Sequence, residues 1–127
     1  MTRILLVVHG IITMAAAVVL AVLPAAIPAT VGISIDVEGW LLSYFLAAAE
    51  LAIALLSLGA VRLGNAAALR LIFDVFIVFH LSTAALEVLY LALTEVTPVL
   101  VANVAIRMVA SALFLIARRS LRIGPAQ

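Results

Sequence analysis

The stretch Leu69–Leu93, LRLIFDVFIVFHLSTAALEVLYLAL, is long and apolar enough to cross a lipid bilayer as one helix. Within that length it carries four ionisable side chains, Arg70, Asp74, His80 and Glu87. Each such group at membrane depth costs about 2.5–3.5 kcal/mol on insertion scales unless it meets a partner or water. The chain therefore has to fold so that several helices enclose a polar interior.

The composition agrees with a membrane protein. Of 127 residues, 69% are hydrophobic and only 10% are charged, a balance typical of membrane chains rather than of soluble domains. We predict an all-α fold, an antiparallel four-helix transmembrane bundle that forms a single domain over residues 1–127. The expected spans are about 4–23, 39–61, 69–93 and 98–117. The first of them has spanning length and three more follow, so it is interpreted as a span and not as a signal peptide.

Arginine is distributed unevenly between the two ends of the predicted bundle. The N-terminus, the turn after the second span and the C-terminal tail share one side, which holds Arg3, Arg62, Arg118, Arg119 and Arg122. The opposite connections contain acidic residues and no basic one: Asp36, Glu38 and Glu95. The positive-inside rule places the arginine side, and with it both termini, in the cytoplasm. We therefore expect a protein of the plasma (inner) membrane.

Polar residues recur three, four or seven residues apart on each predicted span, so they share one face of their helix. Span by span they are His9 and Thr13; Ser43, Glu50 and Ser57; His80, Thr83 and Glu87; and Asn103 and Arg107. Trp40 and Tyr44, at the start of the second span, are expected to be interfacial anchors. Arg70 and Asp74, four residues apart, are close enough to pair with each other. Arg70 can also reach the cytoplasmic headgroups, and the partner expected for Asp74 is either Arg70 or His9.

The depth of each group below its helix end separates two layers. The outer layer contains Glu50, Glu87, Asn103 and Arg107; the inner layer contains His9, Arg70 and Asp74, and His80 falls between them. Because the outer layer has two carboxyl groups and one guanidinium, Arg107 is expected to hold one carboxylate ionised while the other keeps its proton. Such a pair supplies both an acid and a base.

The two layers provide the candidate site residues. Candidate catalytic residues are Glu50 and Glu87 as acid and base, Arg107 and Asn103 to orient them, and His80 as a second acid or substrate contact. Candidate ligand-binding residues are Ser43, Tyr44, Thr83, Asp74 and His9. The alternative for the outer layer is a buried ion-pair network that fixes the helix register, in which the second Glu bonds to Asn103 or to a serine.

We predict no cofactor, no metal and no nucleic-acid partner. His9 and His80 are a conceivable axial pair for a haem, but their expected depths differ. His80 and Glu87 are two turns apart, too distant to hold one metal ion without other helices. The sequence has no cysteine, which excludes disulfides, thiolate metal sites and thiol redox chemistry. It contains no phosphate-binding loop, dinucleotide fingerprint or basic nucleic-acid patch.

The layout resembles the small bacterial four-helix membrane proteins typified by the DoxX-like group. The resemblance covers the whole chain and rests on the four spans, on Pro24 and Pro28 after the first span, and on the second helix, YFLAAAELAIALLSL. It carries over no site residue, and the cysteines that some redox members use are missing here. In chemistry alone, carboxylates that face a lipophilic cavity are similar to those of integral-membrane terpene cyclases and sterol isomerases.

The favoured function is acid–base chemistry, either isomerisation or cyclisation, on a lipophilic small molecule that enters from the bilayer. A proton-coupled transporter, or a protein that binds a lipophilic ligand, would use the same carboxylates. A structural subunit of a larger membrane complex is the third alternative. Four helices form a narrow bundle, so a transport path would require a homodimer, whereas a closed pocket in a monomer favours an enzyme.

Overall fold

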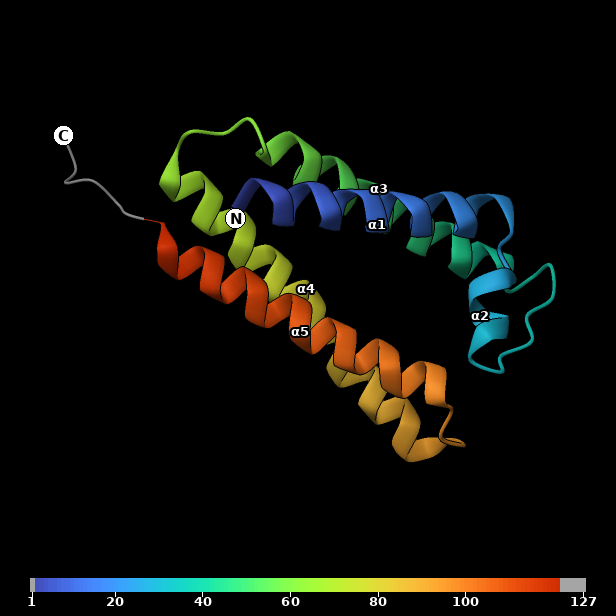
Figure 1. The fold of residues 1–127 in the computed structure, drawn as a ribbon. Coiled ribbons are helices and arrows are strands. Elements are labelled where there is room, and N and C mark those ends of the chain that lie inside the picture. Colours follow the sequence, from blue (N-terminus) through green and yellow to red (C-terminus); the bar gives the residue numbers. More distant parts are fainter. Residues whose placement is uncertain (1, 122–127) are drawn as a thin grey trace. The chain divides into compact units, whose positions relative to one another are not determined.

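The computed structural model describes residues 2–121, and all regular structure in that range is helical. In chain order the helices are α1 (Thr2–Val22), α2 (Ala26–Thr30), α3 (Trp40–Ala60), α4 (Ala66–Leu93) and α5 (Pro98–Ser120) (Figure 1). This confirms the predicted all-α class. Arg122 lies outside the described residues.

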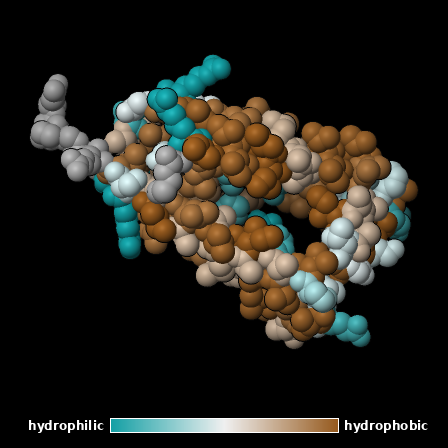
Figure 2. All heavy atoms as spheres, in the orientation of Figure 1, coloured by the Kyte–Doolittle hydropathy of each residue, from teal (hydrophilic) through white to brown (hydrophobic). Residues whose placement is uncertain are grey.

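Four of these helices, α1, α3, α4 and α5, are long and apolar enough to cross a membrane. The protein is therefore a membrane protein, and hydrophobic side chains cover most of the face drawn in Figure 2. Each long helix begins and ends within three residues of its predicted span.

The short helix α2, in the connection after α1, was not predicted from the sequence. Pro28 is compatible with α2 because it is the third helical residue, where a backbone N–H has no partner within the helix.

The chain divides into two compact units. One unit runs from Leu6 to Val61 and contains most of α1 together with α2 and α3. The other contains α4 and α5, and the first residues of α1, up to Leu5, belong to it.

In the first unit, α1 and α3 pack as an antiparallel pair. The end of α1 meets the start of α3, since the Ser43 hydroxyl donates to the carbonyl oxygen of Pro24 at 2.8 Å. The start of α1 meets the end of α3, since the Ser57 hydroxyl donates to the carbonyl oxygen of Leu6 at 2.9 Å. The buried face of α3 consists of small and polar residues: Ser43, Ala47, Glu50, Ala54, Ser57 and Ala60. The predicted polar stripe of this span is thus confirmed as the packing face, and small side chains of this kind let two helices approach closely.

Gly10 is the point of closest approach between α1 and α3. A Cβ atom added at Gly10 would lie 2.7 Å from Cγ and Cδ2 of Leu58 and 3.3 Å from the carbonyl oxygen of Ala54. A methyl group at Gly10 therefore requires the Leu58 side chain to move and the Ala54 carbonyl to shift slightly. A Cβ added at Gly59, by contrast, would meet nothing within 4 Å.

In the second unit, α4 and α5 also run antiparallel, joined by a short turn. Asn65 caps the start of α4 and Thr97 caps the start of α5, each through a side-chain oxygen that accepts backbone N–H groups. An aromatic core joins the two helices: the ring of Phe114 lies 5.6 Å from that of Phe73 and 5.0 Å from that of Phe76. All three rings are fully buried, and tilted ring pairs at such distances add stabilisation beyond area burial.

We predict that Gly10→Ala lowers the melting temperature of the detergent-solubilised protein, because overpacking a tight interface typically costs about 1–3 kcal/mol. Gly59→Ala is the matched control, since it adds the same methyl group to open space and gains roughly 0.5–1 kcal/mol of helix propensity. A Gly10→Ala protein that melts as high as the Gly59→Ala protein would contradict the close α1–α3 packing.

Candidate functional site

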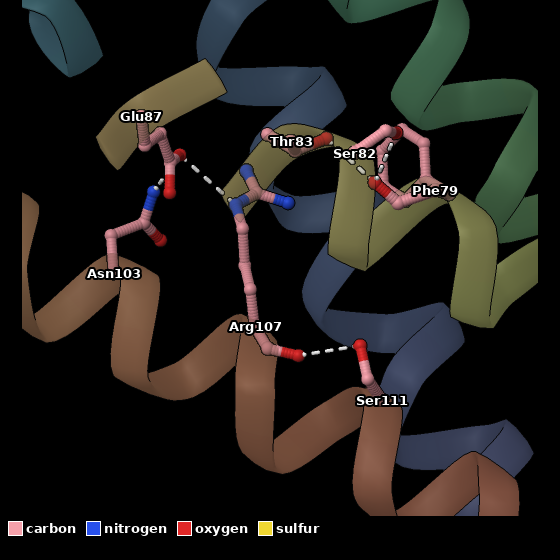
Figure 3. A network of polar contacts seen from close by, with 7 residues as sticks. All are labelled: Phe79, Ser82, Thr83, Glu87, Asn103, Arg107 and Ser111. Carbon is pink, nitrogen blue, oxygen red and sulfur yellow. Dashed lines mark hydrogen bonds and ion pairs between the residues drawn. The ribbon is translucent and has the colours of Figure 1, made fainter. Parts of the chain in front are cut away.

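The α4/α5 unit holds a buried carboxylate between two polar groups of the neighbouring helix. Oε1 of Glu87 accepts a hydrogen bond from Nδ2 of Asn103 at 2.6 Å and another from Nε of Arg107 at 3.0 Å (Figure 3). Only 14% of the Glu87 side chain and 17% of the Arg107 side chain are exposed. The predicted pairing of Arg107 with one of the two carboxylates is confirmed, and Asn103 supports the same carboxylate.

The position of each group follows from helix geometry. Asn103 and Arg107 are four residues apart on α5, so both face α4. At about 1.5 Å per residue, Glu87 lies about 9 Å from the end of α4 and Arg107 about 13 Å from the start of α5. These depths place the ion pair well inside the length that crosses the hydrocarbon layer, where a charge has to be paired and hydrogen-bonded.

The second oxygen of the Glu87 carboxylate is in a different situation. Oε2 is buried and accepts no hydrogen bond from any residue in the described range. A carboxylate oxygen has two acceptor positions, and a buried acceptor without a donor costs roughly 1–3 kcal/mol or more when it is charged. The acceptor positions of Oε2 are therefore not used by any of the described residues.

Arg107 is held in place from several sides. Its guanidinium carbon lies 5.9 Å from the ring centroid of Phe79, within the range of a cation–π contact. Its backbone carbonyl accepts a hydrogen bond from the Ser111 hydroxyl at 2.9 Å. In Figure 3 the Arg107 side chain extends from α5 toward the Glu87 carboxylate. The guanidinium that binds Oε1 of Glu87 thus also contacts the Phe79 ring.

His80 lies two turns before Glu87 on the same helix and is buried. Its ring packs edge-on to Phe79, at 5.3 Å between centroids, and stacks on Phe114 at 6.2 Å with an interplanar angle of 13°. Aromatic packing on two sides orients the imidazole. The role of His80 as a second acid or substrate contact stays a prediction.

Glu50 belongs to the α1/α3 unit, where it lies on the buried face of α3 with 7% of its surface exposed. It is ten residues after Trp40, hence about 15 Å along the helix. The expectation that Glu50 points inward is confirmed. Its pairing with Glu87 as acid and base in one shared cavity stays a prediction.

The α1/α3 unit contains its own set of buried hydrogen bonds, centred on His9 and Ser57. Nδ1 of His9 lies 3.0 Å from the hydroxyl oxygen of Ser57, and the Ser57 hydroxyl donates to the Leu6 carbonyl. A hydroxyl has one hydrogen to give, so the proton of the His9–Ser57 contact belongs to Nδ1 of His9. Thr13 donates to the carbonyl oxygen of His9 at 2.9 Å. His9 is thus an integral part of the packing between α1 and α3.

The remaining candidate ligand-binding residues have local roles in the structure. Ser43 uses its hydroxyl hydrogen on Pro24, and Thr83 donates to the carbonyl oxygen of Phe79 at 2.8 Å. Tyr44 lines an open apolar pocket of about 280 Å³ together with Ala17, Val18, Ala21, Ala47, Ala48 and Leu51. That pocket lies within the α1/α3 unit alone.

The expected pairing of Arg70 with Asp74 is wrong. Asp74 pairs with Arg118 of α5, with 2.5 Å between Nε and Oδ1 and a hydrogen bond of 3.1 Å from Nη2 to Oδ2. Arg70 instead donates through Nη2 to the carbonyl oxygen of Leu121, just after the end of α5. A basic residue four positions before an acidic one is the less favourable order on a helix, so the antiparallel neighbour supplies the better partner.

Within residues 2–121, no group of three or more His, Asp and Glu side chains is arranged to hold a metal ion. His9 and His80, the two histidines considered for a haem, belong to different units. Comparison with protein-family models, with curated proteins and with solved structures finds no match. The resemblance to the DoxX-like group therefore stays a prediction.

We predict that Arg107→Met destabilises the protein by about 3–5 kcal/mol, because it leaves the Glu87 carboxylate buried without its cation. The matched control is Arg118→Met, which breaks a more exposed pair whose side chains are 37% and 46% accessible. That change should cost no more than about 1 kcal/mol.

The double variant Glu87→Met/Arg107→Met should recover most of the stability lost in Arg107→Met, because replacing a whole buried pair by apolar side chains is often neutral. Thermal melting of the unmodified protein, Arg107→Met, Arg118→Met and the double variant in one detergent measures these differences. Equal losses for Arg107→Met and Arg118→Met would contradict a special role for the buried pair.

Proposed function

We propose that the protein is a membrane-embedded enzyme that performs acid–base chemistry, an isomerisation or a cyclisation, on a lipophilic small molecule. One observation supports this most: the Glu87 carboxylate is anchored through Oε1 while Oε2 is buried and accepts no hydrogen bond from the described residues. A base must be held in place and still have an acceptor atom to offer, and Glu87 meets both conditions.

In this proposal Arg107 and Asn103 are positioning residues. They bind Oε1 and fix the direction of the carboxylate, so that Oε2 can take a proton from a carbon of the substrate. The proton then has to be returned at another carbon for the double bond to move or for a ring to close. Either protonated Glu87 gives this proton back, or buried His80 on the same helix donates one and is then reprotonated from Glu87.

The lipophilic nature of the substrate follows from the place of Glu87. The carboxylate lies on a helix of spanning length, about 9 Å from its end. A molecule that reaches this depth from the bilayer has to be largely apolar. A transporter would use the carboxylate without changing any carbon–hydrogen bond, and this difference provides the test.

We predict that membranes containing the protein, exchanged into D₂O, incorporate deuterium at carbon into a lipophilic compound, seen as a mass shift that survives return to H₂O. Glu87→Gln keeps the shape of the side chain and removes the base. Acid–base catalysis typically contributes 10²–10⁴-fold, so the exchange rate of that variant should fall on this scale.

Glu95→Gln is the control, because it makes the same chemical change at an exposed residue of the loop after α4. Melting temperatures of both variants show that they are folded. The enzyme proposal fails if no compound gains deuterium, or if folded Glu87→Gln exchanges as fast as Glu95→Gln.

The proposal includes an orientation, with both termini in the cytoplasm and the chain in the plasma (inner) membrane. It rests on the arginine distribution: Arg62 precedes α4, and Arg118 and Arg119 occupy the last turn of α5. The opposite connections hold Asp36, Glu38 and Glu95 and no arginine.

We expect a membrane-impermeant thiol reagent to label the single-cysteine variant Glu38→Cys from outside intact cells, and Arg119→Cys only after the cells are opened. Both positions are exposed and the chain has no other cysteine. Glu38 is preferable to Asp36, whose carboxylate accepts the backbone N–H of Gly39 before α3. The reversed labelling pattern would refute the orientation.

A further inference from the structure

Five of the six described arginines of the α4/α5 unit lie at one end of it, and Arg107 is the exception. We propose that this arginine end binds the phosphate headgroups of anionic phospholipids. Its described members are Arg3, Arg62, Arg70, Arg118 and Arg119. All five belong to the α4/α5 unit, Arg3 through the first residues of α1.

The lengths of α4 and α5 place the arginine end at the depth of the lipid headgroups. From Asp74 to Leu93, α4 rises about 30 Å at about 1.5 Å per residue, and from Pro98 to Ala117, α5 rises about 30 Å. Each of these stretches alone crosses a hydrocarbon layer of about 30 Å. Arg70 and Arg118 lie just beyond them, where the phosphates of the adjacent leaflet lie.

The charge at this end is not balanced by the protein. Asp74 is the one carboxylate among the described residues there, and it pairs with Arg118. Arg70 donates to a neutral carbonyl, that of Leu121, and so keeps its full charge. Arg62 and Arg119 are exposed and make no ion pair with the described residues. Arginine guanidinium groups bind phosphate oxygens in pairs of parallel hydrogen bonds, so the surplus charge fits phosphate.

The surface beside these arginines favours a lipid over a soluble phosphate. Large apolar side chains are exposed next to them, Leu71 at 67% on α4 and Ile116 at 53% on α5. A phospholipid can place its phosphate on the guanidinium groups and its acyl chains on these side chains at the same time. A soluble phosphate would use only the first contact.

The test compares phosphatidylglycerol with phosphatidylcholine of the same acyl chains, added to the protein purified in a neutral detergent. Retained lipid is measured by native mass spectrometry, and the melting temperature is measured in parallel. Phosphatidylglycerol should be retained preferentially and should raise the melting temperature more, and 0.5 M NaCl should reduce both effects. Glycerol phosphate, which has the headgroup charge and no chains, should produce neither.

Arg62→Gln/Arg119→Gln should bind phosphatidylglycerol roughly thirtyfold more weakly, since each arginine near an anionic surface contributes about 1 kcal/mol. Arg62→Lys/Arg119→Lys keeps the charge and should keep most of the preference, which controls for a loss of fold. Equal retention of both lipids by the unmodified protein overturns the proposal. It is also overturned if the preference persists in the Gln variant, or if glycerol phosphate raises the melting temperature as far as the lipid does.

Discussion

The ion pair between Glu87 and Arg107 is the interaction on which the α4/α5 unit depends. Two charges that lie within the spanning length of a membrane helix are acceptable only in contact with each other and with further hydrogen bonds. Asn103 supplies such a bond, and Phe79 covers the guanidinium. The pair therefore dictates which faces of α4 and α5 meet.

A second pair, Asp74 with Arg118, fixes the same register from the other end of the helices. Between the two pairs lies the aromatic core around Phe114. Moving one helix along the other by a single turn would break both ion pairs and displace the aromatic rings together. Register is thus determined by polar contacts, as expected where lipid gives apolar faces no preference for each other.

Much of this arrangement was predictable from the sequence, because depth and helical spacing are read directly from it. The four spans, the buried face of α3 and the contact of Arg107 with a carboxylate all follow from those two quantities. The partner of Asp74 was not predictable in the same way, since Arg70 on its own helix and Arg118 on the next are both near in expected depth. The order of Arg70 before Asp74 disfavours their pairing only weakly, and the geometry of the α5 end, where Arg70 binds the Leu121 carbonyl, adds to it.

The two oxygens of the Glu87 carboxylate differ in their hydrogen bonding. A pair that served register alone could be replaced by apolar side chains at little cost, and it would gain by satisfying both carboxylate oxygens. Here both hydrogen bonds from α5 converge on Oε1, and Oε2 is buried without a donor from the described residues. An additional hydrogen bond to Oε2 would stabilise the folded state, so the described residues leave that contribution unused. The proposal that Glu87 acts as a base is argued from this unused acceptor, because a base needs an oxygen atom that other groups do not occupy.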